Sequence, residues 1–420
     1  MVTVLMLFAL QDKTQDMDAL KKRVDELERK LSGQDDSDLP KAAQDAKRDA
    51  GEVYSKPFLA RFGRGVYLGG YIDLEFIGTE DNNNDTFDQH RLVPFIYADV
   101  TRNVKVAMEI EIEHGNGTEL GVEFAHMDYW MHDLINFRAG IILDPLGKFN
   151  LVHDAPFQDL TLRPLVDEAV IPAVLREPGV GFFGSLDLDP WEIEYEVYLV
   201  NGFKGLSKAG ATVINRTAGL RSARPHTTAL GTSAYRDFND DKAVVGRLSV
   251  SPFLGLEAGI SAHSGKYDER GDNRLTIWAV DATLNLGGVA RAFGAPSEFL
   301  TRFEVVGEHT RALIGRDARA KAAGVPDDFD GSFVETRFHF MPEFIRAILP
   351  GAVEESTFTL IHRYDTVDLD GFEREAHTVG FNFRPIEDTV FKFEVQFREE
   401  HGLQPDLQND AYVFSVATYF

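Results

Sequence analysis

Residues 145–178 form a long segment between two predicted strands, and its charged side chains are the groups of this chain best spaced to act on a ligand. They are Asp154, Asp159, Arg163, Asp167, Glu168, Arg176 and Glu177. Carboxylates and guanidinium groups at this density can attract or repel ions and polar solutes, most strongly beside low-dielectric walls. The chemistry that they predict is electrostatic selection, without a covalent step.

Other motifs give no sign of catalysis or metal binding. His126 with Asp128, and His153 with Asp154, bring together an imidazole and a carboxylate, but no Ser nucleophile stands at a motif position and no zinc-ligand spacing follows. The stretch "TEDNNNDTFD" alternates acidic and amide side chains as a calcium loop does, but it lacks the required Gly and the bidentate Glu. We therefore expect neither an enzyme nor a metal or cofactor site.

The elements that must position these charges are strands. In "TVFKFEVQFRE", Phe391, Phe393, Val395 and Phe397 share one face, whereas the charged and amide side chains share the other. Segments of this kind recur from about residue 66 to the terminal Phe420, at the length of about 9–11 residues with which a tilted strand crosses a bilayer. The expected strands are 66–77, 90–101, 104–114, 119–131, 135–144, 179–188, 191–202, 243–252, 254–264, 274–287, 299–311, 332–342, 356–366, 373–385, 389–400 and 411–420.

Connection lengths lead to the same fold class. Short links such as 102–103, 189–190 and 386–388 alternate with long polar ones such as 78–89 and 203–242, as in outer-membrane barrels with short periplasmic turns and long outer loops. Residues 65–420 are thus predicted to be an all-β transmembrane antiparallel β-barrel of about 16 strands, with 14 or 18 as alternatives. The apolar side chains of 145–178 then predict a loop folded inward as a constriction; an external lid or a subunit contact is the alternative.

The alternation also assigns charges to the lumen, because the charged face must avoid lipid. An acidic wall is expected from Glu109, Glu111, Glu113, Glu192, Glu194 and Glu196. A basic but mixed wall is expected opposite it, from Arg302, Arg337, Arg363, Arg374, Arg384, Lys392 and Arg398. Arg138 on the fifth strand is also expected on the pore wall. A register error of one residue would reverse each of these assignments.

Composition narrows the function further. With 43 Lys and Arg against 68 Asp and Glu, the net charge is −25, which argues against a nucleic-acid partner and, together with the acidic loop, predicts a weak preference for cations. The absence of Cys excludes disulfides and thiol chemistry.

The first 64 residues read differently from the barrel. Residues 1–10 resemble a signal remnant, and 34–64 a polar linker. Within 11–33, "MDALKKRVDELERKL" repeats apolar residues at spacings of 3 and 4, which predicts a short N-terminal coiled-coil helix. A lone amphipathic helix is the alternative. In front of a barrel, an apolar stripe gains most by pairing with its own copies, so we expect a three-stranded stalk.

The chain resembles the porin superfamily that includes the phosphate-selective porins O and P. The resemblance rests on the N-terminal heptads, on "GGYIDLEF" at 69–76, on "IPAVLREPGVGFFG" at 171–184 and on the final "VFSVATYF". It implies a homotrimer of sixteen-stranded barrels with an inward third loop and passive diffusion of small hydrophilic solutes. Only Arg163, Arg176 and Arg138 could serve as the basic residues of the phosphate-selective members, and the loop carboxylates argue against phosphate selectivity.

Two functions therefore follow as hypotheses. The first is a trimeric porin in the bacterial outer membrane, in contact with its lipids and lipopolysaccharide, that passes ions and small hydrophilic solutes through a charged constriction without a cofactor. The alternative is a structural tether whose coiled coil reaches from the outer membrane to the cell wall.

Overall fold

The computed structural model describes residues 60–61, 65–80, 82–115, 119–225, 237–348, 351, 355–402 and 409–420, with the backbone alone at 60–61, 82–84 and 119. The predicted signal remnant and coiled-coil helix lie outside these residues. Of the predicted linker, the structure describes only the short strand β1 (Ala60–Arg61), which pairs with the first long strand.

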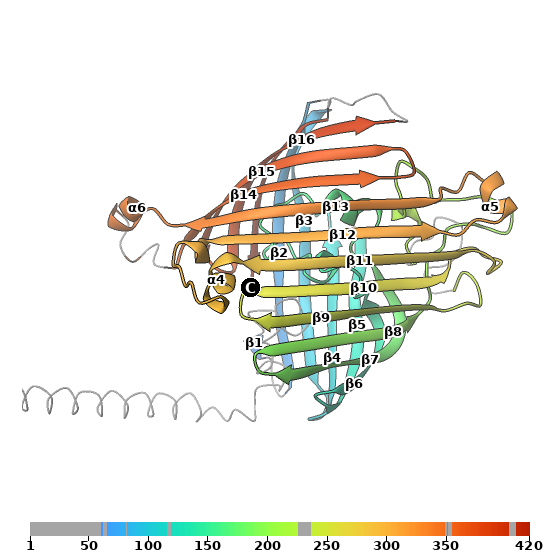
Figure 1. The fold of residues 1–420 in the computed structure, drawn as a ribbon, viewed down its shortest axis with the longest axis horizontal. Coiled ribbons are helices and arrows are strands. Elements are labelled where there is room, and N and C mark those ends of the chain that lie inside the picture. Colours follow the sequence, from blue (N-terminus) through green and yellow to red (C-terminus); the bar gives the residue numbers. More distant parts are fainter. Residues whose placement is uncertain are drawn as a thin grey trace, which may run out of the picture. The chain divides into compact units, whose positions relative to one another are not determined.

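Sixteen long antiparallel strands form a closed barrel (Figure 1). Each strand pairs with the next along the chain, and the last pairs with the first, with Phe414 opposite Phe76. The prediction of sixteen strands in an all-β barrel is confirmed. The strands are β2 (Val66–Thr79), β3 (Asn82–Asp99), β4 (Val104–Glu113), β5 (Glu119–His132), β6 (Ile135–Leu143), β7 (Arg176–Leu188), β8 (Trp191–Val200), β9 (Ala243–Phe253), β10 (Leu256–Lys266), β11 (Arg274–Asn285), β12 (Phe303–Ile314), β13 (Asp328–Phe340), β14 (Thr357–Asp368), β15 (Glu373–Ile386), β16 (Thr389–His401) and β17 (Ala411–Tyr419).

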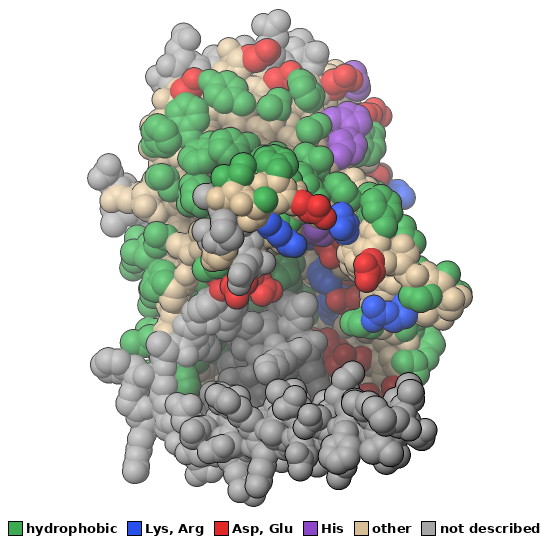
Figure 2. All heavy atoms as spheres, turned by 90° about the vertical axis from the view of Figure 1, so that its left-hand side faces the viewer, with side chains coloured by type: hydrophobic (Ala, Val, Ile, Leu, Met, Phe, Trp, Pro, Cys, Tyr) green, Lys and Arg blue, Asp and Glu red, His purple; other side chains and the backbone are tan. Residues whose placement is uncertain are grey.

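The two ends of the barrel differ in their connections. At one end most links are tight turns, and two longer links contain the helices α4 (Leu286–Ala292) and α6 (Glu343–Ile348). The other end carries the long connections and the helix α5 (Ala318–Ala322), on the opposite side of Figure 1. Charged side chains are visible in the hollow seen from the α4 and α6 end (Figure 2). None of the described helices is long and apolar enough to span a bilayer.

The strand faces separate apolar from polar side chains, as the alternation predicts. On β16, Phe393 and Val395 are exposed on the outer face, whereas Lys392, Glu394 and Gln396 are buried inside. A continuous row of phenylalanine rings runs around part of the outer face near the α4 and α6 end, with neighbouring centroids 4.8–6.3 Å apart. Aromatic rings at this height are typical of the boundary between lipid and water. The row consists of Phe299, Phe303, Phe338, Phe340, Phe358, Phe383 and Phe391.

The apolar outer face of the barrel allows a prediction for a charge that is placed in the bilayer core. Ile260 lies in the middle of β10, is exposed, and pairs with the exposed apolar residues Leu248 and Val280. We expect Ile260→Arg to lower the free energy of unfolding by about 2–4 kcal/mol, because its guanidinium would face the bilayer core. Reversible urea unfolding in lipid vesicles measures this, with Ile260→Leu as the control. Equal stability of the two variants would contradict a lipid-facing position.

Candidate pore constriction

The connection between β6 and β7, residues 144–175, enters the barrel and is held by carboxylates of the wall; we call it the crossing loop. Glu394 on β16 accepts hydrogen bonds from the backbone N–H groups of Thr161 and Leu162, at 2.8 Å each. Asp365 on β14 accepts one from Leu165, at 3.2 Å, where the loop begins its short helix α3 (Leu165–Ala169). These lumen carboxylates thus accept hydrogen bonds from backbone N–H groups of the loop, which is not paired with a neighbouring strand.

The other side of the lumen holds an earlier part of the crossing loop. Glu308 on β12 accepts hydrogen bonds from the backbone of Lys148 at 2.8 Å and of Phe149 at 3.3 Å. The Lys148 ammonium lies 2.6 Å from Glu257 on β10, and Ser261 on the same strand accepts the N–H of Gly147. The loop is therefore bonded to both sides of the barrel.

Asp159 joins the crossing loop to the basic strands. Its carboxylate lies 3.0 Å from Arg384 on β15 and 3.3 Å from Arg337 on β13, and it accepts a hydrogen bond from Asn382. Burial raises the pKa of Asp159, but Arg337 and Arg384 outweigh it and hold this pKa below its ordinary value. The group therefore stays ionised as an anchor.

Three further contacts fix the same part of the loop. The ammonium of Lys392 donates to the carbonyl of Ala155 at 2.7 Å. The Tyr419 hydroxyl donates to Asp154 at 2.9 Å, and the His153 ring lies 3.3 Å from Glu123 on β5. The loop side chains Asp154 and Asp159 therefore face the wall.

The structure thus divides the predicted constriction residues into two groups. Asp154, Asp159, Asp167 and Glu177 are buried and do not line the cavity beside the crossing loop that is described below. Arg163, Glu168 and Arg176 do line it. Most of the loop carboxylates are therefore buried or used in anchoring the crossing loop, and the charged constriction stays a prediction.

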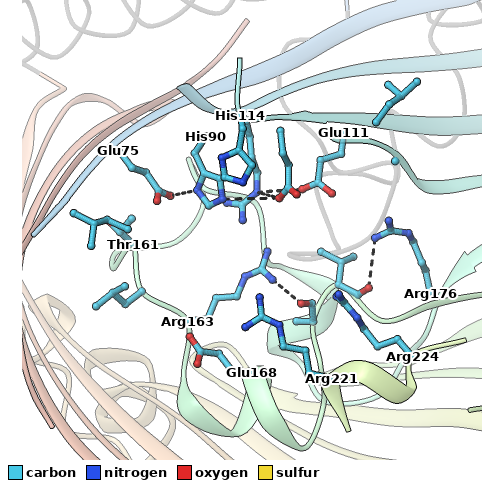
Figure 3. A pocket seen from close by; sticks show the side chains of 18 residues that line it. Glu75, His90, Glu111, His114, Thr161, Arg163, Glu168, Arg176, Arg221 and Arg224 are labelled. Carbon is cyan, nitrogen blue, oxygen red and sulfur yellow. Dashed lines mark hydrogen bonds and ion pairs between the residues drawn. The ribbon is translucent and has the colours of Figure 1, made fainter. Parts of the chain in front are cut away.

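A cavity of about 540 Å³ lies beside the crossing loop, and we call it the passage. Figure 3 shows its two faces. The carboxylate face comes from β2, β3, β4 and the turn after β4, and the arginine face comes from the crossing loop, the start of β7 and the connection after β8. Its charged and imidazole lining consists of Glu75, His90, Arg91, Glu111, Glu113, His114, Arg163, Glu168, Arg176, Arg221 and Arg224.

The carboxylate face is partly neutralised by its own bases. Glu75 lies 2.6 Å from the ring of His90, and Glu111 accepts a hydrogen bond from Arg91 at 3.1 Å. Glu113 lies 3.6 Å from the same guanidinium, and the ring of His114 stacks on His90 at 5.4 Å between centroids. Much of the negative charge on this face is therefore paired.

The arginine face is not neutralised in the same way. Arg163 donates to the carbonyl of Ala173 at 2.6 Å, and the Arg176 guanidinium lies 3.5 Å from the carbonyl of Val174. Among the described residues, neither of them nor Arg221 forms an ion pair with a carboxylate. Burial and the neighbouring charges of Arg176 and Arg221 lower the pKa of Arg224 to about 10, which still leaves it charged at neutral pH. This face presents concentrated positive charge to the passage.

Sequence reasoning missed Arg221 and Arg224. They lie in and next to the 3₁₀ helix η3 (Arg221–Ala223), which reaches the lumen because Leu220 donates its N–H to the carbonyl of Ala169 at 2.8 Å. Gly219 has φ +59°, and a Cβ there would lie 2.2 Å from the carbonyl oxygen of Ala169, so the close approach requires glycine. A signal was present in "TAGLRSARP", which has two arginines and no acid.

The predicted pore-wall residues take several places. Glu111 and Glu113 line the passage, whereas Glu109 is buried 3.2 Å from the Tyr97 hydroxyl. Arg138 is buried against Asp128, at 2.9 Å. Glu192, Glu194 and Glu196 are on the inner side of β8 and do not line the passage.

The predicted basic wall mainly supports the crossing loop. Arg337, Arg363, Arg384 and Lys392 bond to the loop or to the carboxylates that hold it; Arg374 lies 3.8 Å from Glu168, and Arg398 bonds to Gln396. The prediction that Arg302 lies on the pore wall is wrong, because this residue is exposed in the 3₁₀ turn η4 (Leu300–Arg302), before β12 begins. An uncompensated basic sector opposite the acids is therefore absent from these strands in the described structure.

Comparison with known proteins supports the fold class. No family model matches the chain. An uncharacterized protein of Aquifex aeolicus (strain VF5) is 33% identical over 223 residues, which cover 51% of this chain and 48% of the relative, so the match spans about half the length of that curated relative.

Among solved structures, the anion-selective porin from Comamonas acidovorans aligns with a TM-score of 0.53 and 10% identity, over 84% of this chain and 99% of the porin. The trimer form of OmpT, an outer membrane protein of Vibrio cholerae, aligns with a TM-score of 0.50 and 7% identity, over 84% of this chain and 99% of OmpT. At these identities the likeness establishes the fold alone, which is the porin-type barrel.

Proposed function

We propose that the protein is a passive diffusion channel of the bacterial outer membrane, for ions and small hydrophilic solutes. The observation that carries this proposal is the crossing loop, which is bonded to both sides of a sixteen-stranded barrel and leaves a charged passage beside it. A loop that served only as an external lid would not need buried wall carboxylates for its backbone N–H groups. The row of phenylalanines on the outer face supports a membrane location.

The charges around the passage favour anions. Its lining has five guanidinium groups against four carboxylates, and each of the four carboxylates has a base within 4 Å in the same lining or the adjoining wall. Salt screens charges that lie more than about 8–10 Å from a solute. The charges that line the passage therefore govern its selectivity more than the total charge of the protein does. We therefore replace the expected cation preference with a preference for anions and for solutes that carry a carboxylate or phosphate group.

A homotrimer is part of the proposal. The Vibrio cholerae protein with the same fold is described in a trimer form, and the heptads predicted at residues 11–33 would add a three-stranded contact. The outer-membrane lipids and lipopolysaccharide would surround such a trimer.

The experiment is the single-channel current of the purified protein in a planar bilayer under a tenfold KCl gradient. We expect conductance steps in groups of three, and a reversal potential whose sign shows that Cl⁻ passes more readily than K⁺. A reversal potential of the opposite sign would refute the anion preference. Complete silence from folded, heat-modifiable protein would refute the channel and favour the tether.

A further inference from the structure

Three side chains with metal-binding atoms meet where the two ends of the crossing loop join the wall. Asp144 follows the end of β6, Glu177 is the second residue of β7, and His263 is on β10. One ligand atom from each lies within 4.8 Å of the others, and Nε2 of His263 is 2.8 Å from Oε1 of Glu177. All three are buried, with Asp144 and Glu177 at 0% exposure and His263 at 1%.

The carboxylate of Asp144 is the observation that points to a ligand. In the described structure neither of its oxygens accepts a hydrogen bond from an N–H or hydroxyl donor, its close polar neighbour is the carboxyl group of Glu177, and no cation forms an ion pair with it. Its surroundings include the buried residues Ile142 and Leu146. Burying a carboxylate without a partner costs several kcal/mol, so it must either take up a proton or hold a cation.

The charged groups around Asp144 do not supply that cation. Lys204 is close enough to Glu177 to interact with it electrostatically, but its ammonium group has no hydrogen-bond partner in the described structure. Glu177 adds a second negative charge, and its other oxygen accepts the N–H of Gly202. This second bond orients Glu177 and leaves Oε1 directed at His263, as the outer partners of metal ligands commonly do.

The backbone around the cluster is held firmly. Asp144 donates its N–H to the carbonyl of Leu175 at 3.0 Å, so the two ends of the loop are already joined. The side chain of Asn150 donates to the carbonyls of both residues, at 2.9 and 3.0 Å, and accepts the N–H of Leu175 at 2.7 Å. The ring of Phe203 packs edge-on against His263 at 5.2 Å. Ligands on such a frame need little ordering to bind an ion.

We propose that Asp144, Glu177 and His263 together bind one divalent transition-metal ion of the Zn²⁺ type. One imidazole and two carboxylates, with a fourth position for water, suit Zn²⁺, whereas Ca²⁺ and Mg²⁺ prefer sites made of oxygen alone. Around Zn²⁺ with bonds of about 2.0–2.2 Å, tetrahedral ligands lie roughly 3.3 Å apart, so the pair now at 2.8 Å would open by a few tenths of an ångström. The ion would join both ends of the crossing loop to β10.

The test is calorimetric titration of EDTA-treated, detergent-folded protein with ZnCl₂, together with metal analysis of the protein as purified. We expect one high-affinity Zn²⁺ per chain, and at least a 100-fold weaker affinity in His263→Gln and in Asp144→Asn. X-ray absorption at the zinc edge should show one nitrogen ligand with oxygen ligands.

The matched control is His90→Gln. His90 belongs to a second group with metal-binding atoms, Asp73, Glu75 and His90, in which the histidine is partly exposed. We expect this variant to keep the high-affinity site. Loss of binding in His90→Gln with retention in His263→Gln would overturn the assignment.

Heat-modifiable migration identifies folded protein for each variant. If His263→Gln does not fold, the isosteric Asp144→Asn and the wild-type stoichiometry still decide the question. Folded wild-type protein that binds no Zn²⁺ would overturn the proposal and indicate that Asp144 and Glu177 share a proton. Channel activity is not a readout here, so failure of this proposal is distinct from failure of the proposed function.

Discussion

Replacing Arg176 and Arg221 together by serine is expected to turn the passage from a preference for anions to a preference for cations. Both guanidinium groups line the passage, and neither forms an ion pair with a carboxylate of the described residues. Their removal would leave three guanidinium groups against four carboxylates. One charge at about 4 Å contributes on the order of 1 kcal/mol even in water, so two should change the Cl⁻ to K⁺ permeability ratio by roughly tenfold or more.

The measurement is the reversal potential under a tenfold KCl gradient, before and after the substitutions. The matched control is Arg291→Ser with Arg346→Ser, which removes the same charge from the exposed helices α4 and α6. The control should keep the wild-type sign. The same shift in both double variants would mean that total charge, and not the arginine face, sets the selectivity.

The second large effect is expected from Glu394→Ala, which removes the acceptor of two backbone hydrogen bonds in the crossing loop. Bonds to a charged acceptor contribute about 1.5–3 kcal/mol each, so the folded protein should lose roughly 3 kcal/mol of stability. The loop segment near Thr161 would no longer be fixed to β16, and we expect a larger and noisier single-channel conductance.

Glu399→Ala is the control for this change, because Glu399 is exposed on the same strand and, among the described residues, its one ion pair is a 3.8 Å contact with the exposed His401. Urea unfolding in lipid vesicles measures the stability, and planar bilayers measure the conductance. A stable variant with the wild-type conductance would show that the crossing loop does not depend on Glu394.

The strands could be predicted from sequence because their side chains face two different surroundings. On β16 the phenylalanines face outward, and the polar residues between them face the lumen. This alternation can be read from one strand, without knowing which other strands pair with it. It failed at Arg302, where the chain makes a turn before β12 although the apolar pattern continues.

The passage itself was less accessible to sequence reasoning. The alternation predicts which side chains face inward, but their pairing with other groups decides which of the inward charges remain open to a solute. Asp159 is neutralised by arginines more than 170 residues away in the chain, and Glu394 is used by the backbone of the crossing loop. Arg221 reaches the lumen only because Leu220 bonds to Ala169, a contact between two loops that no local pattern encodes.

The wall acceptors of the crossing loop also set an order of assembly. Glu308, Asp365 and Glu394 stand 160, 200 and 233 residues downstream of the loop residues that they bind. The loop is synthesised before these three acceptors, which lie on β12, β14 and β16. A barrel that lacked β14 and β16 would therefore leave the backbone N–H groups of Thr161, Leu162 and Leu165 without these acceptors, so this part of the constriction cannot form before those strands are in place.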